Sequence, residues 1–170
     1  ITSLKKEGYE GSITLVGEEE HLPYQRPPLS KGFLDDSINK ERLYFKKLDF
    51  FTENKIQLKL GISATSVDIE NNLVNLSDED KLHFDKLVFA TGSRVRLLDF
   101  PGNDLDNIHY LRGLDDAENI KKGLEKSKHL VVIGAGYIGL EVAAIASEKG
   151  VKVSIVEMAD RVMSRTVDPQ

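Results

Sequence analysis

The sequence contains no cysteine, which excludes a disulfide framework, a thiolate metal site and a redox-active dithiol within these 170 residues. No apolar run approaches the roughly 20 residues of a membrane span, and the N-terminus does not resemble a signal peptide. Positive charge is not in excess, because 23 Lys and Arg stand against 28 Asp and Glu, a net charge of −5. We therefore expect no nucleic-acid or membrane partner, no metal site and, by default, a cytoplasmic protein.

Residues 129–157 have the order of a βαβ unit. The run 130–133 is continuously apolar, as is typical of a strand buried on both faces. The run 138–149 is rich in Ala, Leu, Ile and Glu and has no Pro, which predicts a helix, and Gly150 follows where that helix would end. Residues 151–156 predict a second strand.

Three glycines, Gly134, Gly136 and Gly139, join the first strand to the helix at G-x-G-x-x-G spacing. The first allows a tight turn, the second lets the backbone approach a pyrophosphate, and the third lets helix and strand pack closely. Glu157 stands 18 residues after Gly139 at the end of the second strand, where an acid can accept both ribose hydroxyls. This order predicts dinucleotide binding rather than a merely structural turn, and the carboxylate favours NADH over NADPH.

A similar half-unit stands at the N-terminus. Residues 1–7 are compatible with a helix that ends at Gly8, and residues 11–18 predict a strand that ends at an acid, Glu18. The same order occurs in residues 148–157, so the chain contains one complete nucleotide-binding unit and the back half of another. We infer that the chain is an internal fragment; the alternative is an ordinary helix and strand in a complete protein.

The middle of the chain is predicted to contain a loop, then helices, then short strands. Residues 21–32 contain three prolines and predict a stiff loop, on which Arg26 and Lys31 are either ligands for an electron-rich group or solvated charges. Residues 33–54 predict one or two helices packed by aromatic side chains. Four short strands in a small antiparallel meander are predicted after that, at 56–60, 64–69, 73–76 and 82–90. The last strand ends at the small residues Thr91 and Gly92, where a ligand can approach closely. A helix should begin at Asp115, and we place a domain boundary near Arg112.

These segments together resemble the FAD-dependent, NAD(P)H-oxidising reductases of the ferredoxin, putidaredoxin and rubredoxin reductase type. The resemblance covers essentially the whole chain and rests on LVGEE at 15–19, HLPYQRPPLSK at 21–31, LVFATG at 87–92 and VVIGAGYIGLEVAA at 131–144. It implies an α/β fold with two Rossmann-like domains, both incomplete here: an FAD-binding part at 1–111 and an NAD(H)-binding part at 112–170.

The resemblance also implies roles for individual residues. Lys31 and Glu141 would form a catalytic pair beside flavin N5, in which the lysine stabilises developing negative charge and the glutamate holds the lysine. The alternative for Glu141 is simple compensation of the helix dipole. FAD would contact Glu18, Arg26, Lys31, Ala64, Thr91, Gly92 and Arg112. NADH would contact Gly134, Gly136, Tyr137, Ile138, Gly139, Glu157 and Arg165.

The function that follows from the resemblance is transfer of electrons from NADH through FAD to a small iron–sulfur ferredoxin or a rubredoxin. Two alternatives are an NADH oxidase or nitrite reductase module, and a non-catalytic NADH-binding protein like the apoptosis-inducing relatives. Disulfide-reducing relatives carry a cysteine pair near the proline loop, and the absence of cysteine excludes that mechanism for these residues. The fragment alone is expected to be inactive.

Overall fold

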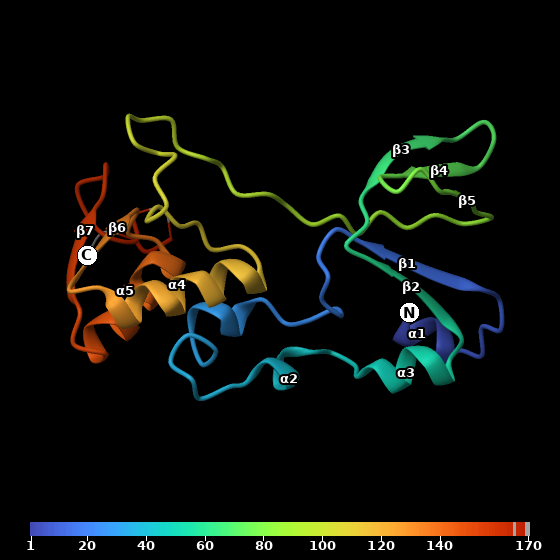
Figure 1. Ribbon diagram of the computed structural model, residues 1–170, viewed down its shortest axis with the longest axis horizontal. Helices are drawn as coiled ribbons and strands as arrows, with labels where there is room; N and C mark the ends of the chain where they lie inside the picture. The colour runs from blue at the N-terminus through green and yellow to red at the C-terminus, as the bar shows by residue number, and fades with distance from the viewer. Residues whose placement is uncertain (165, 169–170) are drawn as a thin grey trace. The chain divides into compact units, whose positions relative to one another are not determined.

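The computed structural model describes residues 1–164 and 166–168, and the chain forms two compact units (Figure 1). The first unit comprises residues 1–24 and 44–92, and the second comprises residues 25–43 and 93–170. No helix in the described ranges combines the length and the apolar character that crossing a membrane requires. The domain boundary near Arg112 stays a prediction.

The first unit contains a two-stranded parallel sheet. Its strands pair in the register that sets Ile13 opposite Ile56 and Gly17 opposite Leu60. Gly8 follows the first helix with φ +79°, a left-handed conformation that glycine adopts readily, so the predicted N-terminal helix and strand are confirmed. The elements are α1 (Thr2–Lys6), β1 (Ile13–Gly17), α3 (Leu48–Glu53) and β2 (Ile56–Leu60).

A three-stranded antiparallel sheet completes the first unit, with β3 (Ala64–Asp68), β4 (Leu73–Leu76) and β5 (Lys81–His83) in that order. The small antiparallel sheet was predicted, but two details were wrong. The run 56–60 is not part of it, because β2 pairs in parallel with β1. The last strand ends at His83 rather than Ala90.

Residues 84–92 lie outside any helix or sheet, and Val88 is 82% and Phe89 is 70% exposed. A strand needs a neighbour that accepts and donates its backbone hydrogen bonds, and none of the strands in the described ranges lies along this segment. An apolar run alone therefore did not suffice to make a strand.

The second unit contains the predicted βαβ arrangement. β6 and β7 are parallel, from His129 opposite Lys152 to Ile133 opposite Val156, and Gly150 ends the intervening helix with φ +81°. The elements are the 3₁₀ helix η1 (Pro27–Ser30), α2 (Lys40–Leu43), α4 (Leu114–Lys126), β6 (His129–Ile133), α5 (Tyr137–Glu148) and β7 (Lys152–Val156).

The core of the second unit joins the segment 25–43 to the βαβ unit. Leu34 is fully buried in a cluster with apolar side chains of α4 and α5. The apolar face of the sheet opposite this core is not covered by the described residues, because Val131 and Ile133 on β6 are 53% and 57% exposed. Within the described residues α5 packs against one face of this strand only, so burial on both faces is not observed.

Candidate functional site

The glycine loop between β6 and α5 has the geometry that its spacing predicts. Gly134 has φ +98°, and a Cβ on Gly139 would lie 2.4 Å from the carbonyl oxygen of Gly134, so a side chain there cannot fit beside the loop. A Cβ on Gly136 would meet no atom within 4 Å. The second glycine thus leaves open space at the start of α5, while the third permits close packing of helix and loop.

Glu157 lies next to this loop. Its Oε2 atom accepts a hydrogen bond from the backbone N–H of Ala135 at 2.8 Å, and its Oε1 atom accepts one from the N–H of Ala159 at 3.0 Å. The carboxylate is exposed at the end of β7, within reach of a ligand bound at the loop. Arg165, predicted to contact the adenosine side of NADH, lies outside the described residues.

The features of the loop fit a dinucleotide. The first N–H groups of α5 have no acceptor within the helix and lie at the positive end of its dipole, where a phosphate is favoured. The open space at Gly136 is where a pyrophosphate would approach the backbone, and Glu157 supplies the acceptor for a ribose. The residues present therefore match the requirements of NAD(H).

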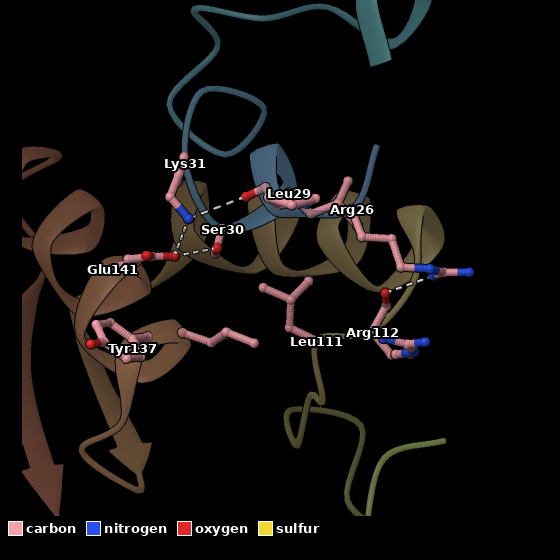
Figure 2. A pocket seen from close by; sticks show the side chains of 10 residues that line it. Arg26, Leu29, Ser30, Lys31, Leu111, Arg112, Tyr137 and Glu141 are labelled. Atoms are coloured by element: carbon pink, nitrogen blue, oxygen red, sulfur yellow. Dashed lines mark hydrogen bonds and ion pairs between the residues drawn. The ribbon is translucent and has the colours of Figure 1, made fainter. Parts of the chain in front are cut away.

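A cavity of about 400 Å³ lies beside the first turn of α5 (Figure 2). Three stretches far apart in the sequence contribute to it: the proline loop, residues 111–112 ahead of α4, and α5 itself. Six of the predicted site residues meet here. The lining consists of Arg26, Pro27, Leu29, Ser30, Lys31, Leu111, Arg112, Tyr137, Ile138 and Glu141.

Lys31 and Glu141 form the expected contact, with 2.8 Å between Nζ and Oε2 (Figure 2). Burial alone would raise the pKa of the Glu141 carboxyl, but the hydrogen bonds from Lys31 and Ser30 outweigh burial and lower that pKa. The Lys31 side chain is 53% exposed, and ion pairs this accessible add at most about 1 kcal/mol to stability. The catalytic role of the pair stays a prediction.

Arg26 and Arg112 line the same cavity and are held by backbone contacts. Nη1 of Arg26 donates to the carbonyl oxygen of Arg112 at 2.8 Å, and Nε of Arg112 donates to the carbonyl oxygen of Ser93 at 2.8 Å. Asp116, in the first turn of α4, accepts from the backbone N–H groups of Arg112 and Gly113 at 2.9 and 2.8 Å. This cap fixes the backbone at Arg112. The lining of the cavity therefore includes three cationic side chains and one carboxylate.

The remaining predicted FAD residues belong to the first unit. Glu18 directly follows β1 and is exposed, whereas its neighbour Glu19 accepts a hydrogen bond from the hydroxyl of Tyr24 at 2.5 Å. Ala64 is the first residue of β3 and is also exposed. Thr91 and Gly92 end the segment 84–92, and Gly92 has φ +67°. Their contacts with FAD stay predictions.

Sequence reasoning missed two residues of the site. Ser30 donates a hydrogen bond to Glu141 from a buried position, and nothing in the spacing of the proline loop indicates this. Asp116 caps α4 at Arg112; an acid in the first turn of a helix also compensates the helix dipole, so its position alone does not indicate the cap.

The family model of the pyridine nucleotide-disulphide oxidoreductases matches residues 1–170. The chain belongs to this family. Rhodocoxin reductase from Rhodococcus erythropolis is 44% identical over 165 residues, which are 97% of this chain and 39% of that protein. Rubredoxin-NAD(+) reductase from Pseudomonas putida is 40% identical over 166 residues, which are 98% of this chain and 43% of that protein.

A solved structure of a ferredoxin reductase from Rhodopseudomonas palustris matches with a TM-score of 0.93 and 43% identity, over 99% of this chain and 41% of the other. The resemblance seen in the sequence motifs is thus confirmed. The chain spans about 40% of the length of the relatives it matches. Despite the family's description, no cysteine is available here for disulfide chemistry.

Proposed function

We propose that the protein to which these residues belong is a flavoprotein oxidoreductase that passes electrons from NADH through FAD to a small iron–sulfur ferredoxin or a rubredoxin. FAD and NAD(H) are the proposed cofactors, held by two Rossmann-like domains. The proposal combines the geometry of the second unit with the family to which the chain belongs.

The observation that carries the proposal is the cavity in which Lys31 and Glu141 meet beside the first turn of α5. This turn directly follows the glycine loop, so a nicotinamide cofactor bound there could extend toward the pair. When bound, FAD supplies an acceptor that takes a two-electron hydride and can release the electrons singly. Hydride transfer needs a positive charge where negative charge develops, and Lys31 offers one.

Besides Lys31, four lining residues have a part in the proposed reaction. Glu141 holds the Lys31 ammonium in one place, and it can do so because its carboxyl is ionised at neutral pH. Arg26 and Arg112 add positive charge that favours an anionic cofactor. Tyr137 is 59% exposed at the start of α5 and offers an aromatic face against which a planar ring could stack.

The names of the relatives support the proposed class of electron acceptor, a ferredoxin or a rubredoxin. One relative at 40% identity is a rubredoxin-NAD(+) reductase, and one solved structure at 43% identity is a ferredoxin reductase. Both acceptors are small proteins that carry redox-active iron. An acceptor of the same class is therefore proposed here.

The proposal is tested on the full-length protein loaded with FAD. Anaerobic mixing with NADH should bleach the visible flavin absorption, and addition of an oxidised ferredoxin or rubredoxin should restore it. Rapid consumption of oxygen without transfer to either acceptor would indicate an NADH oxidase instead. Slow bleaching with a long-lived charge-transfer band would indicate a nucleotide-sensing protein, and a protein that retains no flavin would refute the proposal.

A further inference from the structure

Ser30 is the one buried polar or charged residue in the part of the chain that the structure describes, with 4% of its surface exposed. Burying a hydroxyl costs free energy unless a hydrogen bond replaces its contacts with water. Ser30 has such a partner, because its Oγ donates to Oε2 of Glu141 at 2.5 Å. The buried hydroxyl is thus directed at a residue of the proposed catalytic pair.

Two donors from adjacent residues meet on one carboxylate oxygen. Oε2 of Glu141 accepts from Oγ of Ser30 and from Nζ of Lys31, at 2.5 and 2.8 Å (Figure 2). Nζ of Lys31 also donates to the carbonyl oxygen of Pro27 at 3.4 Å. An ammonium has three N–H donors, so one donor of Lys31 remains for a group bound in the cavity.

The backbone that carries both donors is held firmly. Pro27 and Pro28 fix the backbone φ angles at the start of η1, and Leu29 is 2% exposed. The N–H of Lys31 donates to the carbonyl oxygen of Pro28 at 3.0 Å. Ser30 therefore has little freedom to leave the Glu141 carboxylate.

We propose that Ser30 is a positioning residue for the Lys31–Glu141 pair: its hydroxyl fixes the Glu141 carboxylate in one orientation, and the carboxylate in turn fixes the Lys31 ammonium. This inference rests on the proposed function, because the pair matters only where hydride transfer takes place. The Lys31 side chain is 53% exposed, and ordering two long side chains in an ion pair costs conformational entropy, which the Ser30 hydrogen bond to Glu141 offsets.

The Ser30 hydrogen bond should also affect the pH at which the Lys31–Glu141 pair is lost. Ser30 and Lys31 from the proline loop contact the Glu141 carboxylate, and the two arginines and Tyr137 line the same cavity. Glu141 is the carboxyl group in this cavity lining, so it is the group there that titrates in acid. Loss of the Ser30 hydrogen bond removes one of the interactions that lower the pKa of Glu141. The pair would then be lost at a higher pH.

The test compares Ser30→Ala and Ser30→Cys in the FAD-loaded full-length protein. Alanine removes the hydroxyl, and cysteine replaces it with a slightly larger thiol that donates only weakly. Ser37→Ala is the matched control, since Ser37 lies shortly after the proline loop, is exposed, and donates from Oγ to the carbonyl oxygen of Gly32. The rate of flavin reduction by NADH is measured by stopped flow after a pH jump, across the acid range.

Both Ser30 variants should reduce the flavin about tenfold more slowly at neutral pH, the effect of losing roughly one hydrogen bond to a charged group. The acid limb of their pH profiles should move to higher pH, and the control should match the wild-type protein. Ser30→Thr keeps the hydroxyl and should restore the profile. A wild-type profile in both variants would overturn the inference, and so would an unaffected Glu141→Gln variant.

The proposed function can fail separately, because it fails if the wild-type flavin is not reduced by NADH. If Ser30→Ala does not fold, Ser30→Cys decides the question, because its side chain still fills the buried space. A loss of rate that follows loss of bound FAD, with no change in the pH profile, would show a merely structural role and would also overturn the inference.

Discussion

Replacing Gly136 with alanine should weaken NADH binding without unfolding the protein. Gly136 has φ −84° and ψ −176°, an extended conformation that alanine adopts freely, and the added Cβ would meet no atom within 4 Å. The change in the free energy of unfolding should therefore be small, at most about 1 kcal/mol from the altered helix cap. The same methyl group would occupy the space through which a pyrophosphate approaches the backbone.

The loss of NADH affinity can be estimated from the hydrogen bond that the methyl group would block. One hydrogen bond from a backbone N–H to a charged phosphate contributes about 1.5–3 kcal/mol, so the Kd for NADH should rise about 10- to 150-fold. The Kd is obtained from the dependence of the flavin-reduction rate on NADH concentration, and stability from thermal unfolding of the same FAD-loaded protein.

Gly139→Ala is the matched control, with the opposite expectation. Its Cβ would lie 2.4 Å from the carbonyl oxygen of Gly134 and 3.1 Å from Cγ1 of Val132, so helix and loop must separate. Such overpacking costs about 1–3 kcal/mol, visible as a lower Tm. A Gly136→Ala protein with an unchanged Kd, or one destabilised as much as Gly139→Ala, would refute the assignment of the loop.

Three further outcomes are expected. Lys31→Met should slow flavin reduction by NADH about 100-fold with little loss of stability. The control Lys40→Met removes an ion pair to Glu118 and should leave flavin reduction at the wild-type rate. Equal rates in the wild-type protein and both variants would contradict the role of Lys31. Asp36→Asn should destabilise the protein by at most about 1 kcal/mol at neutral pH. Hydrogen bonds from two lysines lower the pKa of Asp36, so the stability that Asp36 contributes is present above the ordinary aspartate pKa and is lost as pH falls through the lowered pKa. Urea unfolding of the wild-type protein and the variant as a function of pH measures this contribution. A stability difference that persists in strong acid would show that it does not come from the ionised carboxylate. Glu157→Arg should raise the kcat/KM ratio of NADPH to NADH, and an unchanged ratio would remove Glu157 from the ribose site.

The sequence by itself determined the βαβ unit of residues 129–157, because its signals are local. A glycine turn, a helix without proline and a glycine stop each act within a few residues, and the close approach at Gly139 follows from the strand and helix that it joins. The spacing to Glu157 also brought its carboxylate to the loop, where it accepts from Ala135.

Only the tertiary structure decided which apolar runs found partners. The run 130–133 is covered on one face and residues 84–92 pair with no described strand, because burial and strand pairing depend on neighbours distant in the sequence. The same holds for the site. Lys31 and Glu141 are 110 residues apart in the sequence, and the contact between them depends on Leu34 packing the proline loop onto α4 and α5. The hydrogen bond from Ser30 to Glu141 also depends on this packing. A hydrogen bond between residues far apart in the sequence leaves no periodic pattern in either segment, so the sequence did not indicate it.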